Sequence, residues 1–529
     1  MIQREKNYIG IYSRLSNAGF NRSDFEVVKE KLRREALFNH RISLYLLSDT
    51  IKSIFPLIKD SNIEEKICTT ISKSLSRTLN CDEFLSITNW EELSELTSDI
   101  CDELIADIDQ HVASLLPGGT PISFNPRLSI SNTLKKILGK IYKALNLTAP
   151  FFLLLDDFDT LTAEQQGFIF KVARERSHEL VCFKYGLMTL GQKNFLAGDG
   201  ITYREGDDYD HIPLQWHDRG LSSEKGAKGN YKSTVVKIAN KRIEASNWPD
   251  EIKYLSLYNN WSNGNNIRNE VRKIALEEYE GMEKRPESFS SLWSKQGDAR
   301  YFRHLKSKKI EHLYSGPNTI IDLSSGIFRQ FLELNSRIVS SALDRNWTPE
   351  PNKKIRQDVQ NITIREYAND MLRSLGETAG DVSTLSQCEF DITSTHLINL
   401  SNSLIRLFSN RLYSDVKDAE VIAVAIKGDL FSPSFSKSIL DIAVRESILQ
   451  RRNIDYPSKT HSEGRLPTFS LNKRLAPKGN LGVKMQGRYE INIDDIELAA
   501  TNTDEFLKKF SAKKSSKKPI ENEMQGSLL

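Results

Sequence analysis

The chain has 529 residues, of which 39% are apolar and 27% charged, and its formal net charge is +3. This length predicts about three domains, and the small net charge argues against a protein that binds nucleic acid through its overall field. The five cysteines are scattered, with no Cys-x-x-Cys pair, which disfavours a disulfide framework or a zinc site. No apolar run approaches the roughly 18 residues of a membrane helix, so we expect a soluble, cytoplasmic protein with no membrane partner.

The first quarter of the chain is predicted to be one strand followed by helices. Residues 8–15, YIGIYSRL, are rich in β-forming residues and predict a strand. A long helix is expected from Asp24, which can serve as its N-cap, and further helices over 63–79 and 91–116. The composition of 117–126, PGGTPISFNP, predicts a loop that ends this helical stretch.

The most informative stretch is 151–160, FFLLLDDFDT. Its five large apolar residues predict a strand that is buried on both faces, and Asp156 and Asp157 follow where this strand ends. Open α/β sheets bind ligands at the carboxyl ends of their strands. Two carboxylates there can hold Mg²⁺ and orient the water that attacks a γ-phosphate. This is the form of a Walker B motif; the alternative is a buried strand with an acidic turn that caps the next helix.

Strands and helices alternate around this stretch. Helices are expected over 128–145 and 162–176, where Thr160 or Thr162 can cap the second one. Further strands are expected at 180–190, LVCFKYGLMTL, and at 209–216, YDHIPLQW. This alternation indicates α/β layering with a parallel sheet.

The rest of the chain is predicted to be helical, with a small mixed unit at its end. Four helices between 230 and 343 predict a helical subdomain, and prolines at 349–351 mark a linker. The elements expected beyond it are helices near 364–375 and 393–412, a strand at 420–427, a helix at 434–449, β elements at 469–475 and 489–493, and a helix at 494–510. This order suits a winged-helix type module.

Several of these stretches, in this order, resemble the origin-recognition-complex type AAA+ ATPases, and in particular their bacterial relatives, which overlap with STAND signalling ATPases. YIGIYSRL resembles the strand that follows the P-loop helix, and FFLLLDDFDTL resembles the Walker B strand. KYGLMTLG resembles the strand that ends in the sensor-1 residue, and DYDHIPLQW the last core strand. NTIIDLSSGIFRQFLEL resembles the lid segment that carries sensor 2, and GRLPTFSLNKRLAPKGNL a stretch of the carboxyl-terminal module.

The resemblance implies an architecture of four parts. An α/β P-loop-type core occupies 1–225, with an incomplete parallel sheet and a long helical insertion at about 24–116. A helical lid follows at 226–348, and a winged-helix-like α+β module at 349–510. The lysine-rich residues 511–529 are expected to be disordered.

The resemblance also implies roles for single residues of the core. Asp156 matches the aspartate that coordinates Mg²⁺ beside the nucleotide. Asp157 stands where a water-activating glutamate is usual, and Thr189 matches the catalytic sensor-1 residue. Because aspartate is one methylene shorter than glutamate, the carboxylate of Asp157 is poorly placed to reach the water, and fast hydrolysis is not expected.

Three arginines are candidates for contacts with the nucleotide. Arg329 is the preferred sensor 2, because it begins an apolar helix that Ser324 or Ser325 can cap. Arg300, in the string QGDAR, is the rival sensor 2, and the alternative for both is a surface ion pair. Arg204 lies where AAA+ proteins often place an arginine finger, although a solvated loop arginine is the favoured interpretation there.

A Walker A sequence, Gly-x-x-x-x-Gly-Lys-Ser/Thr, does not occur in the chain. The nearest string, GAKGNYKST at 226–234, has Tyr231 where the second glycine must be and follows the Walker B stretch, so we assign it no phosphate role. Three explanations are open: the start lies inside a longer reading frame, another polypeptide supplies the P-loop, or the sheet closes differently and nucleotide binding is lost. We favour the first.

Two functions remain under consideration. The first is a nucleotide-dependent switch in DNA-linked regulation, replication or defence, ATPase-like but with slow or absent hydrolysis; its cofactors are ATP and Mg²⁺ if the missing P-loop is supplied, and none otherwise. The second is a non-catalytic scaffold that binds DNA through the carboxyl-terminal module and its lysine tail, or that binds a protein partner or a second copy. The basic residues considered for a DNA-binding face are Arg451, Arg452, Lys473, Arg474 and Lys478.

Overall fold

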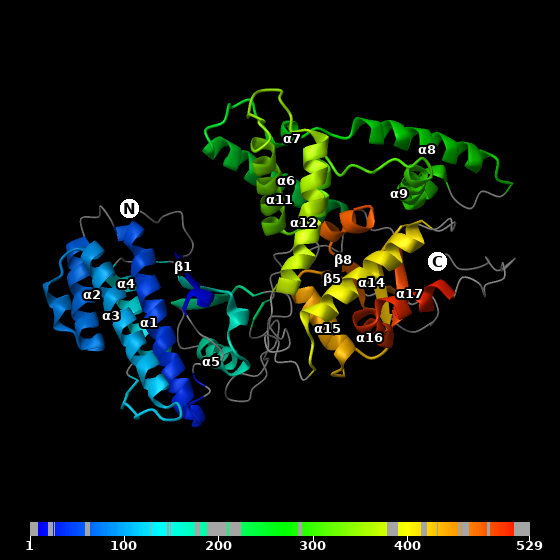
Figure 1. Cartoon of the computed structure of the whole chain (residues 1–529). Coiled ribbons are helices and arrows are strands. Elements are labelled where there is room, and N and C mark those ends of the chain that lie inside the picture. The colour runs from blue at the N-terminus through cyan, green and yellow to red at the C-terminus, as the bar shows by residue number, and fades with distance from the viewer. Residues whose placement is uncertain are drawn as a thin grey trace. The chain divides into compact units, whose positions relative to one another are not determined.

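The chain divides into two compact units, Met1–His211 and Ile212–Leu529. In this computed structural model (Figure 1) the described residues are 9–18, 25, 27–58, 64–126, 128–144, 148, 150–174, 180–187, 209–210, 224–283, 288–377, 390–413, 420–430, 432–452, 456–457, 465–483 and 487–512. Most of the strand expected at 209–216, and the tail beyond Ala512, therefore lie outside the described residues. None of the helices in the described ranges is long and apolar enough to cross a membrane.

The first unit contains the parallel sheet that the sequence predicts. Its strands are β1 (Ile9–Arg14), β2 (Phe151–Asp156) and β3 (Val181–Tyr185), in the order β1-β2-β3. Burial alternates along β1 and β2, so one face of the sheet is fully buried and the other is only partly covered. The expectation that the 151–160 strand is buried on both faces is therefore wrong for the face of Phe152 and Leu154, which are half-buried.

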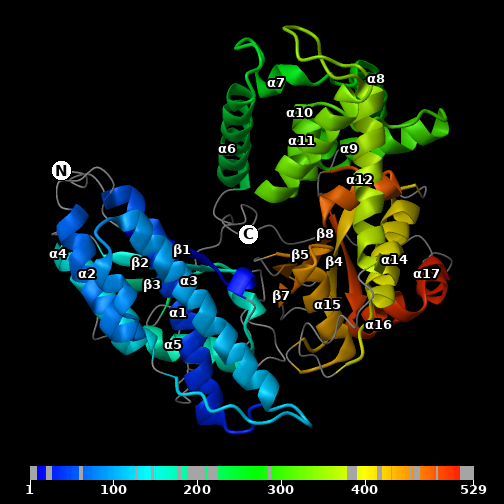
Figure 2. The same cartoon turned by 60° about the vertical axis from the view of Figure 1, so that its left-hand side comes forward.

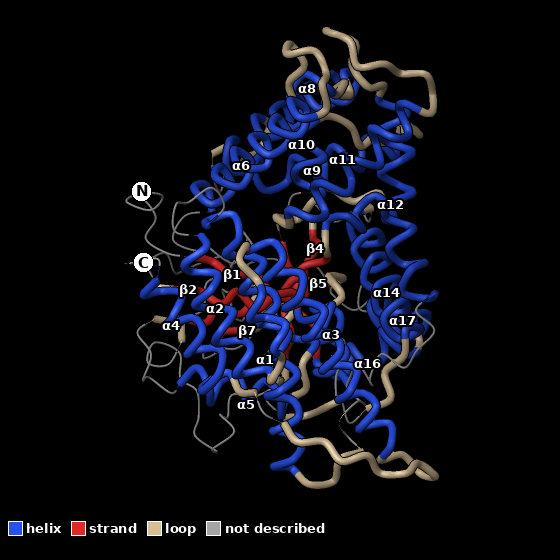
Figure 3. The backbone as a smooth tube through the Cα atoms, turned by 90° about the vertical axis from the view of Figure 1, so that its left-hand side faces the viewer, coloured by secondary structure: helices blue, strands red, loops and turns tan. Residues whose placement is uncertain are grey.

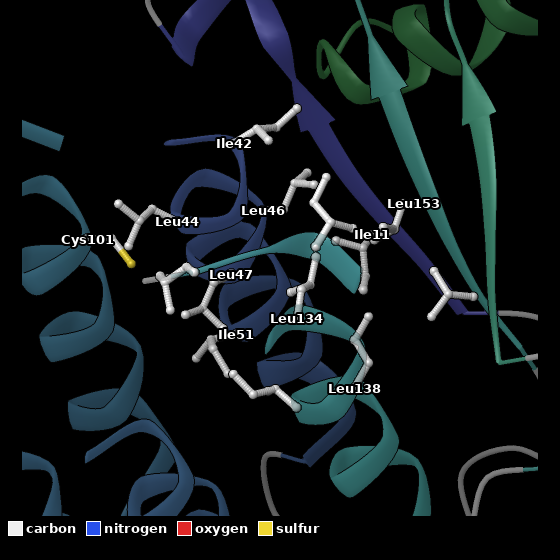
Figure 4. Close-up of a cluster of buried hydrophobic side chains, with 14 of the residues drawn as sticks. Ile11, Ile42, Leu44, Leu46, Leu47, Ile51, Cys101, Leu134, Leu138 and Leu153 are labelled. Atoms are coloured by element: carbon white, nitrogen blue, oxygen red, sulfur yellow. The ribbon is translucent and has the colours of Figure 1, made fainter. Parts of the chain in front are cut away.

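Five helices in the described part of this unit pack around this sheet or on one another, and α1 lies directly on β1. They are α1 (Lys31–Ile58), α2 (Glu64–Leu79), α3 (Trp90–Ser114), α4 (Lys135–Ala144) and α5 (Ala163–Arg174). The helix expected from Asp24 begins at Lys31, seven residues later. Figure 2 shows α1, α2 and α3 running beside one another, and α1 packs against both β1 and α3. Because α1 lies between the sheet and α3, it needs apolar residues on two sides: Leu46 faces Ile11 of the sheet and Leu44 faces Cys101 (Figure 4).

The second unit is helical in its first half. Its helices are α6 (Glu224–Ala245), α7 (Tyr254–Leu257), α8 (Ser262–Glu280), α9 (Phe289–Ser307), α10 (Pro317–Leu323), α11 (Phe328–Leu343), α12 (Gln357–Glu377) and α14 (Ser394–Leu412). The residues Tyr231, Tyr254, Phe331 and Tyr367 belong to one aromatic-rich core that joins α6, α7, α11 and α12. Helices make up most of both units, as Figure 3 shows.

A four-stranded sheet follows, in the order β5-β8-β4-β9. It contains β4 (Val421–Lys427), β5 (Leu449–Arg451), β8 (Thr468–Leu471) and β9 (Gly487–Asn492), and a separate hairpin pairs β6 (Tyr456–Pro457) with β7 (Arg465–Leu466). Strand β8 is antiparallel to β4 and β5, whereas β9 is parallel to β4. The packed helices are α15 (Phe435–Arg445), α16 (Ile493–Thr501) and α17 (Thr503–Ala512). The winged-helix assignment of this module stays a prediction.

Two expected elements of this module differ from the structure. The β element expected at 469–475 ends at Leu471, because Asn472 caps a 3-10 helix over Lys473–Gly479 by accepting a hydrogen bond from Arg474 N–H. The single helix expected at 494–510 is two helices, which are separated at Asn502.

Candidate functional site

The two aspartates lie where β1 and β2 end next to each other. Arg14, the last residue of β1, pairs with Asp156, the last residue of β2. Asp157 follows with φ of 54° and ψ of 38°, the left-handed region that aspartate tolerates better than most residues. This turn directs the chain into α5, whose first turn is capped by Thr162: its Oγ1 accepts from Gln165 N–H at 3.2 Å.

Asp156 is held by a hydroxyl donor and sits over a glycine. The hydroxyl of Tyr12 donates to Asp156 Oδ2 at 2.7 Å. This hydrogen bond, with smaller contributions from burial and charge, raises the pKa of Tyr12, so the phenol keeps its proton. A Cβ atom on Gly186 would lie 2.5 Å from Asp156 Oδ1, so a larger residue at that position would push the Asp156 carboxylate aside. Gly186 itself is fixed between Leu155 O and Phe158 N–H.

Asp157 is held by a cation and a second hydroxyl. Arg14 Nε donates to Asp157 Oδ2 at 2.8 Å, and Ser16 Oγ donates to the same oxygen at 2.6 Å. The hydrogen bond to Asp157 raises the pKa of Arg14. The side chains of Arg14 and Asp157 are 50% and 33% exposed, so this ion pair contributes little to stability. A carboxylate oxygen that already accepts two hydrogen bonds is a poor base for a water molecule, so Oδ2 of Asp157 is not free to activate one in this arrangement.

Tyr12, Arg14 and Ser16 are site residues that the sequence interpretation missed. The signal was present, because alternation along YIGIYSRL puts residues 12 and 14 on one face of the strand. What was lacking was the parallel register of β1 with β2, which brings that face beside Asp156.

The residues present fit a Mg²⁺ ion that arrives with a nucleotide. Asp156 can supply one carboxylate oxygen, and protein sites for Mg²⁺ commonly use one or two carboxylates together with phosphate oxygens and water. Within the described residues no group of three or more His, Cys, Asp or Glu side chains could hold a metal ion by itself. The string GAKGNYKST falls within helix α6, where Tyr231 is buried and hydrogen-bonds to Ser324 rather than lining a phosphate loop.

Thr189 and Arg204 lie outside the described residues. Arg329 is exposed in the first turn of α11, in the second unit, and makes no ion pair with any described residue. Arg300 is engaged, since its guanidinium pairs with Glu278 at 2.5 Å. The expected caps of α11 are wrong: Ile327 is its N-cap residue, whereas Ser324 ends α10.

The basic residues considered for a DNA-binding face divide into two groups. Arg451 and Arg452 lie where β5 leads toward the β6–β7 hairpin, and Arg452 N–H donates to Thr468 O. Lys473, Arg474 and Lys478 belong to the 3-10 helix that follows the other end of β8, since β5 and β8 are antiparallel. Arg474 is half-buried, and the pKa of its guanidinium is lowered by burial, with Tyr367 as hydrogen-bond partner. Only the first group lies beside the hairpin.

A parallel sheet with paired aspartates at the carboxyl end of its central strand, and with helices packed on it, is compatible with an α/β core of the AAA+ type. The model of the ORC-CDC6-like family matches residues 2–491, and the chain belongs to this family. The family is one of AAA+ proteins, which generally bind ATP with Mg²⁺ and commonly bind DNA and oligomerise. No curated protein and no solved structure matches the sequence significantly.

Proposed function

We propose that this chain is an AAA+ type conformational switch that binds ATP with Mg²⁺ and hydrolyses it slowly or not at all. The observation that carries the proposal is the placement of Asp156 and Asp157 at the carboxyl end of β2. Bound Mg²⁺ would neutralise phosphate charge beside Asp156. Arg329, exposed at the start of α11 in the second unit, is the residue that we propose as sensor 2, because its guanidinium is available to a phosphate group.

The geometry of Asp157 supports slow hydrolysis. Its Oδ2 accepts hydrogen bonds from Arg14 and Ser16, so it would have to leave both before it could take a proton from water. The shorter reach of aspartate compared with glutamate adds to this effect. We therefore propose that nucleotide binding, rather than hydrolysis, controls the conformation of the chain. We also propose that the protein has a DNA-linked role in regulation, replication or defence.

The test is Mg²⁺-dependent binding of a fluorescent ATP analogue. We expect the wild-type chain to bind in Mg²⁺ and to lose most of its affinity in EDTA. Asp156→Asn should weaken binding on the order of tenfold in Mg²⁺ and have no effect in EDTA, because it removes a charged ligand of the ion. The matched control is Asp99→Asn, an exposed aspartate on α3 of the same unit. A wild-type chain that binds no nucleotide at any Mg²⁺ concentration would refute the proposal.

A second candidate is a scaffold that binds DNA through the carboxyl-terminal module without using nucleotide. The absence of a Walker A sequence and the position of Arg451 and Arg452 beside the β6–β7 hairpin favour it. Phosphate contacts make binding strongly salt-dependent. We expect the double variant Arg451→Ala/Arg452→Ala to reduce the salt slope by about two if the hairpin contacts DNA, and deletion of 511–529 to reduce it if the tail does. Weak binding with a flat salt dependence would instead indicate a protein partner or a second copy.

A further inference from the structure

A strained turn precedes α11, the helix that carries Arg329. Ser325 has φ of 55° and Gly326 has φ of 80°, both in the left-handed region. A serine in this region costs free energy and persists where its surroundings hold it. Ser325 is 4% exposed, so its polar groups must find partners inside the protein.

Those partners come from the carboxyl-terminal sheet. Ser325 Oγ donates to Asn472 Oδ1 at 2.9 Å and accepts from Lys473 N–H at 2.8 Å. The side chain of Gln450, in β5, donates to the carbonyl of Ser325 at 3.1 Å. Because Asn472 directly follows β8, two neighbouring strands of one sheet hold the same turn.

Asn472 is the centre of this network. It is fully buried, and its Oδ1 accepts from Ser325 Oγ and from a backbone N–H of the 3-10 helix that it caps. Its Nδ2 donates to Ser447 O at 2.8 Å and to Gln330 Oε1 at 3.4 Å. Both acceptor and both donor positions of the amide are therefore used. Gln330 is buried in the first turn of α11, and its neighbour in the sequence is Arg329.

We propose that Asn472 is a positioning residue through which the carboxyl-terminal sheet sets the orientation of the first turn of α11, and with it the nucleotide affinity at Arg329. The nucleotide half of this inference rests on the proposed function. An amide with four partners cannot shift by a small amount without leaving buried groups unpaired, so the turn and the sheet move together. By linkage, whatever moves the sheet changes nucleotide affinity, and nucleotide changes the sheet to the same extent.

The first arm of the test is hydrogen exchange of the full chain without nucleotide. The amides of Ile327 and Phe331 are hydrogen-bonded, to Ser324 O at 2.9 Å and to Ile327 O at 3.1 Å, so they report on the turn. We expect Asn472→Ala to accelerate their exchange on the order of tenfold, since opening the turn no longer breaks the network. Ser325→Ala keeps the side-chain amide of Asn472, so it should accelerate the exchange of the Ile327 and Phe331 backbone amides by a smaller factor. This variant replaces Asn472→Ala in the experiment if Asn472→Ala does not fold.

The control for global destabilisation is Ser403→Ala. Ser403 is fully buried in the same unit and donates to Ala499 O at 2.8 Å, between α14 and α16. It should leave the exchange of Ile327 and Phe331 unchanged. Equal exchange in wild type, Asn472→Ala and Ser325→Ala, or equal acceleration in Ser403→Ala, overturns the inference.

The second arm measures affinity for a fluorescent ATP analogue in Mg²⁺. Asn472→Ala and Arg329→Ala should each weaken binding on the order of tenfold, and the double variant no further than either, because both changes remove the same contact. Accelerated exchange with unchanged affinity overturns the link between the sheet and the nucleotide. A wild-type chain that binds no nucleotide refutes the proposed function, while the exchange arm still decides whether Asn472 positions α11.

Discussion

Glu420 is a fully buried carboxyl group just before β4, and it makes stability depend on pH. Its Oε1 accepts from Gly482 N–H at 2.5 Å, whereas its Oε2 has no hydrogen-bond partner among the described residues. Burial raises the pKa of Glu420 to about 8; the hydrogen bond from Gly482 opposes this shift, and Asp298 adds to it. The nearby cations Arg268 and Arg303 lower the pKa but do not reverse the effect of burial.

The magnitude follows from the two pKa values. In the unfolded chain the group has its ordinary pKa of 4.5, so between pH 4.5 and about 8 the folded state keeps a proton that the unfolded state releases. The contribution is fully present below pH 4.5 and is lost as pH rises toward the folded pKa, at up to about 1.4 kcal/mol per pH unit. Between pH 6 and pH 8 the loss comes to about 2 kcal/mol, because the folded state also begins to titrate near pH 8.

The assay compares wild type with Glu420→Gln by urea unfolding at pH 6 and pH 8. Five of the six tryptophans lie in Ile212–Leu529, so tryptophan fluorescence follows mainly the unit that contains Glu420. The amide is neutral at both pH values and keeps the acceptor for Gly482, so its stability should fall by about 2 kcal/mol less than that of wild type. Glu497→Gln, an exposed control on α16, should behave as wild type. Equal pH dependence in wild type and Glu420→Gln would refute the assignment of a buried, protonated carboxyl group.

Three further changes test the candidate site and the core behind it. Arg14→Ala should raise ATP turnover severalfold, because it removes the cation that holds Asp157. Phosphate release measures the turnover. An unchanged rate with retained ATP binding would show that the ion pair does not limit hydrolysis. Gly186→Ala should weaken Mg²⁺-dependent nucleotide binding on the order of tenfold, as Asp156→Asn does, because the new methyl group displaces the carboxylate of Asp156. The unfolding midpoint should change little, and titration with the ATP analogue that shows unchanged affinity would contradict this prediction. Leu47 lies on α1, between the sheet and α3, and Leu47→Ala should lower the free energy of unfolding of the first unit by about 2–5 kcal/mol. A decrease below about 1 kcal/mol in urea unfolding would contradict the packing of Figure 4.

The sequence was sufficient for the parts of the fold that depend on local pattern. The β-rich residues 8–15 and the apolar runs at 151–155 and 180–190 predicted the three strands of the first sheet, although 188–190 lie outside the described residues. The positions of Asp156 and Asp157 followed from the end of the second run. The start of the first long helix was predicted wrongly: Asp24 is a residue type that favours N-caps, but the helix begins at Lys31. Local propensity at one residue is a weak predictor where tertiary contacts decide the boundary.

Contacts between distant segments could not be predicted from pattern alone. Arg14 and Asp157 are 143 residues apart, and their pairing requires the register of two parallel strands. Asn472 and Ser325 are 147 residues apart, and neither carries a recognisable motif. The sequence around a buried asparagine does not show whether its side chain makes one hydrogen bond or four. Its role can be recognised only from the positions of the segments that pack against it in the folded structure.

The two aspartates of the candidate site differ in what a ligand must displace, and this difference separates binding from hydrolysis. Asp156 is held by the neutral hydroxyl of Tyr12, a side chain that is 53% exposed and can turn to water when a cation takes its place. Asp157 is held by a charged guanidinium together with a hydroxyl, so releasing it leaves a cation without its partner. Under the proposed function, Mg²⁺ with a nucleotide would engage Asp156 at the cost of one hydrogen bond, while Asp157 keeps its hydrogen bonds to Arg14 and Ser16. If ATP binds as proposed, hydrolysis then needs a separate event that moves Arg14 away from Asp157, and the nucleotide-bound state persists until that event occurs.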